Sequence, residues 1–170
     1  MVIADWINRT MQHEGGFTND PNDRGNWTGG QTWVGECKGT NFGISASSYP
    51  SLDIKSLTAT QAFDIYLKDY WQKMNLNILN SQQVAWKLFD IGVNSGTETA
   101  IKMLQRVIGT PQDGVLGAVT ASTANSMNEA RLLALIGKEQ ALHYCAIVVE
   151  NQSQLKYLVG WIARSLDLGF

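Results

Sequence analysis

The chain has little of what a disulfide-stabilised, membrane-spanning or nucleic-acid-binding protein needs. Its 170 residues hold two cysteines, Cys37 and Cys145, which are too few for a disulfide framework. Lys and Arg number 13 against 15 Asp and Glu, so the net charge of −2 argues against the basic face that a nucleic-acid partner requires. No apolar run approaches the roughly 20 residues of a membrane span. We expect no nucleic-acid partner, no stable membrane insertion and a monomer.

A secretory signal and a metal site are also missing from the sequence. The start, MVIADWINRTM, lacks a basic n-region and an uninterrupted apolar h-region. We therefore expect a chain that is made in the cytoplasm and leaves it by a separate route. His13 and His143 have no companion residues at ligand spacing, so we predict no metal and no cofactor.

A carboxylate stands where the first helix should carry an apolar residue. Ile3, Ile7, Thr10 and Glu14 recur at helical spacing and share one otherwise apolar face of a helix expected over residues 1–14. The two glycines that follow predict a C-cap and leave space in front of the carboxylate. Partial burial would raise the pKa of Glu14, which suits a general acid. The alternative is a charged helix end without a role.

The next segment, residues 17 to 45, is rich in Asn, Asp, Gly, Thr and Trp and predicts turns and short strands. Asp23 lies nine residues after Glu14 and supplies a second carboxylate. Glycoside hydrolysis commonly uses two such groups, one to protonate the leaving oxygen and one to activate water or stabilise positive charge. Thr28 and Thr40 are both candidates for a third polar group, and spacing alone does not choose between them.

Three strings in this region resemble a known family. They are Glu14-Gly-Gly, then N-D-P-x-D over residues 19–23, and T-N-F-G-I-S over residues 40–45. Together they are similar to the N-terminal signature of glycoside hydrolase family 108, the phage-type and secretion-associated N-acetylmuramidases, whose motif reads E-G-G, N-D-P-x-D, G-G-x-T-N-x-G-I. The resemblance implies that Glu14 is the catalytic acid.

The sequence departs from this motif at one place, because residues 29 to 39 stand as extra sequence before the threonine step. Thr28 keeps the spacing from Asp23, whereas Thr40 keeps the neighbours Asn41, Phe42 and Gly43. We favour Thr40 as the third catalytic residue beside Glu14 and Asp23. Substrate contacts are predicted for the remaining polar residues of the motif, Asn19, Thr28 and Asn41.

The extra loop carries Trp27, Trp33 and Cys37. It either reaches over the sugar groove, where aromatic faces stack on apolar sugar faces, or forms a hairpin packed on the domain. The sequence leaves both interpretations open.

The rest of the chain predicts helices that support a mainly α, lysozyme-like fold with a small loop and β-hairpin lobe carrying part of the active groove. We predict helices over residues 56–75, from residue 81 to about residue 92, over residues 100–109 and over residues 128–150. The first begins with a Thr58-x-x-Gln61 capping box. We expect a catalytic region over residues 1–80 and a helical peptidoglycan-binding region over residues 81–170, packed as one globular unit.

Three later segments also resemble the family. Asp90 and Asn94 lie in D-I-G-V-N-S-G, which is similar to its D-x-x-V-N-x-G segment. We predict that both contact substrate, and a helix cap followed by a turn is the alternative interpretation. Residues 113–120, D-G-V-L-G-A-V-T, resemble a turn of small wall-binding modules, with Thr120 as an expected helix cap. The closing G-W-I-A-R implies that Trp161 packs and that Arg164 pairs with a carboxylate.

The resemblance implies an N-acetylmuramidase, or lysozyme, that hydrolyses peptidoglycan glycan strands between N-acetylmuramic acid and N-acetylglucosamine. We expect a phage or prophage endolysin that reaches the cell wall through a separate export route such as a holin. A lytic transglycosylase is the nearest competing enzyme. A non-catalytic wall-binding module is the alternative from another class.

Overall fold

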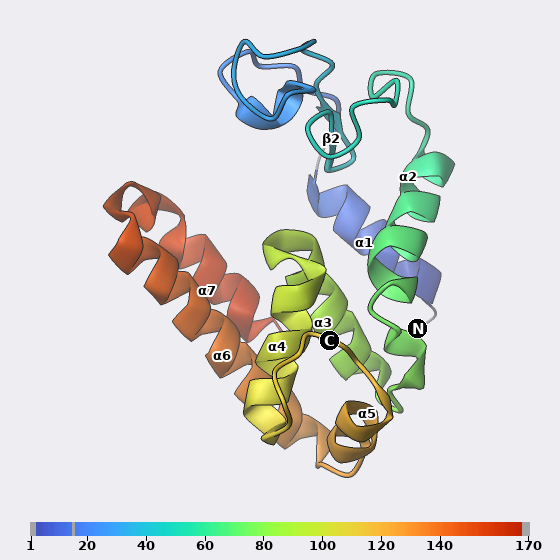
Figure 1. Ribbon diagram of the computed structural model, residues 1–170, viewed down its shortest axis with the longest axis vertical. Helices are drawn as coiled ribbons and strands as arrows, with labels where there is room; N and C mark the ends of the chain where they lie inside the picture. Colours follow the sequence, from blue (N-terminus) through green and yellow to red (C-terminus); the bar gives the residue numbers. More distant parts are fainter. Residues whose placement is uncertain (1–2, 15, 168–170) are drawn as a thin grey trace. The chain divides into compact units, whose positions relative to one another are not determined.

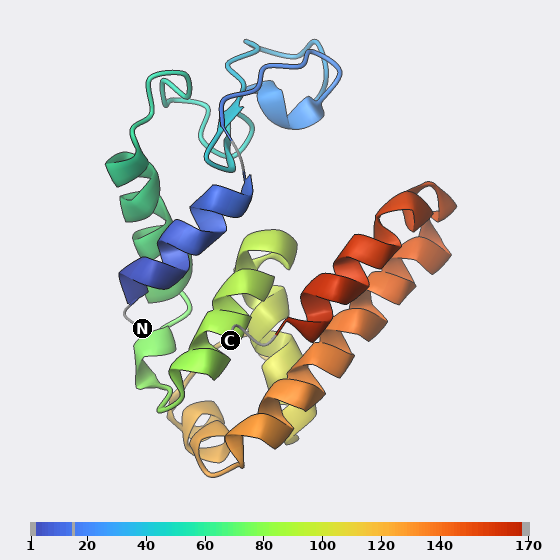
Figure 2. The same ribbon diagram turned by 180° about the vertical axis from the view of Figure 1, so that it is seen from behind.

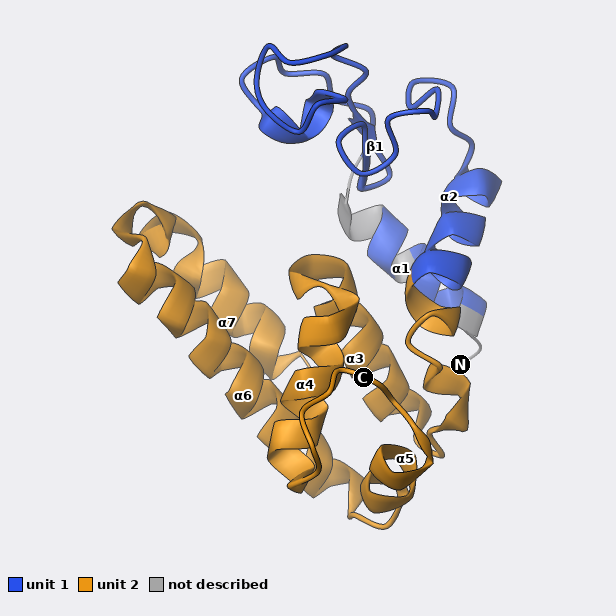
Figure 3. Cartoon of the chain, in the orientation of Figure 1, with its two compact units in different colours: residues 1–69 blue, residues 70–170 orange. Residues whose placement is uncertain are grey.

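The chain is mainly helical, and its one paired sheet among the described residues has two short strands (Figure 1). The computed structural model describes residues 3–14 and 16–167, without the side chains of six residues of the first helix: Ile3, Trp6, Arg9, Gln12, His13 and Glu14. The chain divides into two compact units, residues 1–69 (unit 1) and 70–170 (unit 2), which Figure 3 colours separately. This confirms the predicted mainly α fold with a small lobe of loops and short strands.

Unit 1 is built on two helices that pack against each other, α1 (Ile3–Glu14) and α2 (Ala59–Tyr66) (Figure 2). Ile7, Thr10 and Met11 of α1 are buried, as the helical spacing predicts. α2 begins with the predicted capping box, in which the Thr58 hydroxyl accepts the Gln61 amide and the Gln61 side chain accepts the Thr58 amide. The chain then continues into a π-helical segment, η2 (Leu67–Gln72), which the sequence pattern does not reveal.

Between these helices lies a lobe, residues 16–57, made almost entirely of turns. It holds a short 3₁₀ helix, η1 (Arg24–Asn26), and the antiparallel strands β1 (Thr40–Asn41) and β2 (Ile44–Ser45). Phe42 and Gly43 join the strands with φ angles of 51° and 75°. Two consecutive left-handed residues make the type I′ turn that suits a two-residue hairpin, which explains the glycine at position 43. The same turn holds the bulky Phe42 in a conformation that such residues rarely adopt.

Unit 2 is a helical bundle. Its elements are η3 (Leu76–Ile78), α3 (Gln82–Ser95), α4 (Thr97–Ile108), α5 (Ala118–Asn125), α6 (Glu129–Glu150), η4 (Gln152–Tyr157) and α7 (Leu158–Leu166). The hydroxyl of Ser81 caps α3 and the side-chain amide oxygen of Asn128 caps α6. The prediction that Thr120 caps a helix is wrong, because the N-cap of α5 is Gly117 and Thr120 lies inside that helix.

α6 is the longest helix of unit 2 and packs against α3, α4 and α7. α6 and α7 lie side by side in both views (Figures 1 and 2). Leu132, Ile136, Gln140, Tyr144 and Val148 form the buried side of α6. With 22 residues and a mean hydropathy of 1.4 in its most apolar window, α6 is long and apolar enough to cross a membrane, although the core helix of a bundle meets the same criteria. The expectation concerned uninterrupted apolar runs, and α6 is interrupted by Arg131, Lys138 and Glu139. The absence of membrane insertion stays a prediction.

Candidate active site

The predicted second carboxylate, Asp23, is exposed at the start of η1. Its Oδ1 atom accepts a hydrogen bond of 2.8 Å from the backbone N–H of Gly25, which makes it the N-cap of the 3₁₀ turn. The carboxylate is therefore held in one orientation by the turn that follows it. Its Oδ2 atom accepts no hydrogen bond from any residue that the structure describes, so this oxygen is available to a water molecule or a substrate hydroxyl.

Asn26 joins the Asp23 turn to Thr40 and was not predicted from the sequence. Its side chain is fully buried. The Nδ2 atom donates to the backbone oxygen of Asp20 at 3.0 Å, and the Oδ1 atom accepts from the Thr40 hydroxyl at 2.7 Å. Because a buried amide must satisfy both its donors and its acceptor, this residue fixes the N-D-P-x-D turn relative to β1. The signal that could have indicated it is weak, since an asparagine in a polar loop is ordinarily solvated.

Thr40 lies close in space to the chain that leaves α1. Its backbone exchanges two hydrogen bonds of 2.8 Å with Thr18, four residues after Glu14. Its hydroxyl is half-buried and donates to Asn26, and its backbone pairs with Ser45 on the other side. The structure thus ties the predicted threonine and the N-D-P-x-D turn into one lobe. The Glu14 side chain, the predicted acid itself, lies outside the described part of the structure.

Thr28 is engaged in a hairpin formed by residues 27–37. Its hydroxyl accepts the backbone N–H of Glu36 at 2.9 Å, and its own N–H donates to the Glu36 carbonyl at 3.0 Å. Trp27 and Cys37 bridge at the base of this hairpin. The extra sequence is therefore a hairpin, as one of the two interpretations predicts, and its predicted reach over a sugar groove stays a prediction. Cys37 and Cys145 are both free thiols.

Asn41 and Asn19, both predicted to contact substrate, differ in their surroundings. Asn41 is buried, and its Nδ2 atom donates to the backbone oxygens of Ile54 and Leu57 at 3.3 and 3.4 Å. The side-chain amide nitrogen of Asn41 is thus used to hold the chain that leads into α2. Asn19 is exposed, and its backbone oxygen accepts a hydrogen bond from the Cys37 thiol at 3.7 Å. Their contacts with substrate stay predictions.

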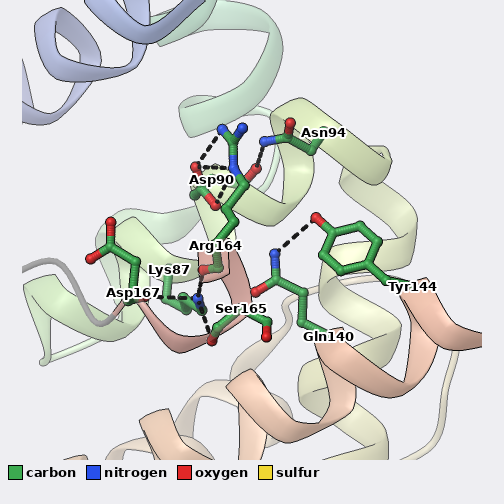
Figure 4. Close-up of polar contacts among 8 residues, drawn as sticks. All are labelled: Lys87, Asp90, Asn94, Gln140, Tyr144, Arg164, Ser165 and Asp167. Atoms are coloured by element: carbon green, nitrogen blue, oxygen red, sulfur yellow. Dashed lines mark hydrogen bonds and ion pairs between the residues drawn. The ribbon is translucent and has the colours of Figure 1, made fainter. Parts of the chain in front are cut away.

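Asp90 and Asn94 lie on α3 in unit 2, where both have internal partners (Figure 4). The Asp90 carboxylate is buried and accepts three hydrogen bonds from Arg164: from Nε to both oxygens at 3.1 Å, and from Nη2 to Oδ1 at 2.8 Å. Asn94 donates to the backbone oxygen of Asp90 at 2.7 Å. The predicted pairing of Arg164 with a carboxylate is confirmed, and so is the packing of Trp161, whose ring stacks on Tyr144 at 5.0 Å. The structure thus gives Asp90 a role inside the bundle, and its contact with substrate stays a prediction.

One turn below Asp90 on α3, Lys87 is fully buried (Figure 4). Its ammonium donates to the backbone oxygens of Arg164, Ser165 and Asp167 at 2.8 to 3.0 Å, at the C-terminal end of α7. These are carbonyls that a helix end leaves without internal partners, and a cation there is favoured by the helix dipole. Removal from water lowers the pKa of Lys87 to about 8, against the opposing attraction of Asp90. The sequence analysis missed this residue.

The segment that resembles a wall-binding turn, residues 113–120, is held by one buried side chain from α4. Gln105 is fully buried. Its Nε2 atom lies 2.6 Å from Asp113 Oδ1, 3.0 Å from the Val115 oxygen and 3.3 Å from the Thr120 hydroxyl, and its Oε1 atom accepts the Gly114 N–H. Beside this turn is a cavity of about 380 Å³ that Lys73, Thr97 and Leu116 help to line. The turn is therefore a rigid part of unit 2.

Comparison with known protein families finds a match that runs from the first helix to the end of α3. Residues 7–96 match the family described as glycosyl hydrolase 108. This match spans more than half of the chain. The chain belongs to the glycosyl hydrolase 108 family. Residues 99–166 match a second family, described as a predicted peptidoglycan domain. A search of curated proteins found no match.

Among solved structures, the chain is similar to the one titled "Structure of Brucella abortus SagA". The two are 26% identical, the similarity covers 96% of this chain and 92% of that one, and the TM-score is 0.72. Family membership and the second domain together make this chain a glycoside hydrolase directed at peptidoglycan. The two family matches meet between residues 96 and 99, whereas the compact units divide between residues 69 and 70. The predicted division at residue 80 lies between these two positions and stays a prediction.

Proposed function

We propose that this family 108 hydrolase is an N-acetylmuramidase, which cleaves the bond between N-acetylmuramic acid and N-acetylglucosamine with Glu14 as proton donor. The observation that carries the proposal is the hydrogen-bonded lobe of unit 1. Backbone pairing of Thr18 with Thr40, and the buried side chain of Asn26, hold Asp23 and Thr40 in the same lobe as the chain leaving Glu14. Two of the three groups predicted from the sequence, Asp23 and Thr40, therefore belong to one hydrogen-bonded lobe, which supports the proposal.

The chemistry divides between a proton donor and a group that handles water. Glu14 gives its proton to the glycosidic oxygen as the bond breaks, so that the leaving sugar departs as a neutral alcohol. Asp23, with Oδ1 fixed by Gly25 and Oδ2 open, accepts a proton from the attacking water. Thr40, whose hydroxyl proton is directed at Asn26, offers its oxygen lone pairs to orient that water.

Exchange of Glu14 for glutamine tests the proposal. Glu14→Gln keeps the shape of the side chain but cannot donate the proton, and loss of general acid catalysis costs roughly 100 to 10,000-fold in rate. The measurement is release of reducing ends from purified peptidoglycan, with folding checked by circular dichroism. Asp64→Asn is the matched control, since Asp64 is exposed on α2 of the same unit; it should keep the parental rate. A folded Glu14→Gln protein that works at more than about a tenth of the parental rate would remove Glu14 from the proposal.

For the biological setting, we propose a monomeric phage or prophage endolysin that is made in the bacterial cytoplasm and reaches the wall through a holin. The resemblance of the motifs supports this setting. Expression in a bacterial host with and without a co-expressed holin tests it: cultures should lyse only with the holin, and lysis by the enzyme alone would contradict the export route.

A further inference from the structure

Trp33, at the tip of the 27–37 hairpin, combines two features that packing does not account for. Its side chain is 71% exposed. Its backbone has a φ of 67°, in the left-handed region that a bulky residue rarely adopts. Such strain persists only where the surrounding structure imposes it, and it concentrates at functional sites. The hairpin therefore holds a large aromatic ring at the surface, where it can meet a ligand, despite the strain in its backbone.

The hairpin imposes this conformation through its backbone. Gly29 donates to the Val34 oxygen at 3.1 Å, and Val34 donates to the Gln31 oxygen at 3.1 Å, which closes the chain on both sides of Trp33. A Cβ atom on Gly29 would lie 2.5 Å from the Val34 side chain, and one on Gly35 would lie 2.2 Å from the Thr28 hydroxyl. Both glycines are thus needed for the two halves of the hairpin to come this close.

A second tryptophan supports the first. The Trp27 ring is buried, and its centroid lies 5.1 Å from that of Trp33, with an angle of 52° between the planes. Its indole N–H donates to the backbone oxygen of Pro21 at 2.9 Å, in the turn that leads to Asp23. Trp33 is therefore braced, through Trp27, on the same turn that carries the predicted catalytic carboxylate.

We propose that Trp33 is a sugar-binding platform, on which a pyranose ring of the peptidoglycan glycan strand stacks with its apolar face. This inference rests on the proposed function and adds a binding subsite to it. An aromatic ring gains from contact with a flat apolar face, and sugar sites combine such contacts with polar groups at the edges. Gln31, Thr32 and Glu36 on the hairpin are polar and exposed, while Val34, directly after Trp33, adds an apolar side chain that is 47% exposed. These surroundings fit a ligand with one apolar face and hydroxyl groups at its rim better than they fit an extended apolar surface.

Two variants separate the backbone strain at Trp33, which affects stability, from the proposed sugar contact, which affects KM. Trp33→Gly should leave the melting temperature at or above that of Trp33→Ala, because glycine adopts a positive φ without cost. Both variants should raise KM for soluble glycan strands about tenfold, the loss expected for one aromatic contact. Both should leave kcat within about twofold, since uniform binding is what is removed.

Trp33→Phe and Trp33→Leu are the matched pair that separates stacking from general apolar contact. The phenylalanine keeps a flat aromatic face and should restore KM to within about threefold of the parent, whereas the leucine should behave like alanine. A parental KM in Trp33→Ala, or a leucine variant as good as the phenylalanine, would overturn the proposal. Either result would be obtained with an active enzyme and would leave the muramidase proposal standing. If the parental protein itself released no reducing ends, it is the proposed function that would fail.

Discussion

Removal of Arg164 should destabilise unit 2 strongly, because it leaves the Asp90 carboxylate buried without its partner. The carboxylate side chain is only 7% exposed, while the arginine side chain is 29% exposed. Breaking a buried pair by removing one partner typically costs about 3 to 5 kcal/mol, compared with at most about 1 kcal/mol for an exposed pair. The half-buried arginine places Arg164→Leu at the lower end, at about 3 kcal/mol. For a chain of this length that loss corresponds to a melting temperature lower by about 6 to 12 °C.

The double variant Asp90→Leu/Arg164→Leu separates the pair from the packing of its side chains. Replacement of both partners by apolar residues removes the uncompensated charge, so we expect a loss of less than about 1 kcal/mol. Arg131→Leu on the exposed side of α6 is the matched control, and it should change stability by no more than about 0.5 kcal/mol. The assay is urea unfolding of the full chain, followed by far-ultraviolet circular dichroism.

Two results would refute this reasoning. One is a decrease of less than about 1 kcal/mol in the free energy of unfolding of Arg164→Leu, which is what an exposed ion pair contributes. The other is a double variant as unstable as the single one, because the carboxylate would then not be the source of the cost. The double variant also bears on Asp90 as a substrate contact: parental KM in the folded protein would confine Asp90 to its role in the bundle.

Three further predictions concern single side chains. The pKa of Lys87 is lowered from 10.5 to about 8 in the folded protein, so the unfolded state binds more protons between these two pH values. The free energy of unfolding should therefore rise with pH over that interval, by up to about 3 kcal/mol relative to Lys87→Met. Urea titrations in which the difference between the two proteins stays constant from pH 8 to 10.5 would contradict this prediction. Thr40→Val should reduce kcat on peptidoglycan at least about tenfold, whereas Thr28→Val should act mainly on KM; the reverse pattern would assign the family threonine to Thr28. Asp23→Asn should lower kcat by roughly 100-fold or more while the melting temperature stays near that of the parent, since an amide oxygen can still cap Gly25, and near-parental rates would remove Asp23 from catalysis.

The parts of the fold that could be predicted from the sequence are those in which local chemistry decides the structure. The buried face of α1 follows from helical spacing, and the start of α2 follows from Thr58 and Gln61, which are three residues apart. The pairing of Arg164 with a carboxylate was implied by the family resemblance, although Asp90 was not named as that carboxylate. The first two signals lie within a few residues of the structure that they predict, whereas Arg164 and Asp90 are 74 residues apart and only the resemblance indicated that Arg164 has a carboxylate partner.

Buried polar residues escaped prediction because their partners are distant in sequence. Lys87 looks like a solvated lysine on α3, and the carbonyl of Arg164 that it binds is 77 residues away. Asn26 looks like an ordinary loop asparagine, although it holds Thr40 across 14 residues. The strained conformation of Trp33 is likewise imposed by hairpin closure, which the composition of the loop does not reveal.

The central claim, hydrolysis of the muramic acid bond with a positioned water, is tested most directly by the chemical ends of the products. Purified peptidoglycan is digested with the full chain, reduced with borohydride and analysed by mass spectrometry. The account predicts fragments that end in reducible N-acetylmuramic acid and carry the mass of one added water. Anhydromuramic ends would show an internal hydroxyl attacking in place of water, as in a lytic transglycosylase, and would contradict the roles given to Asp23 and Thr40.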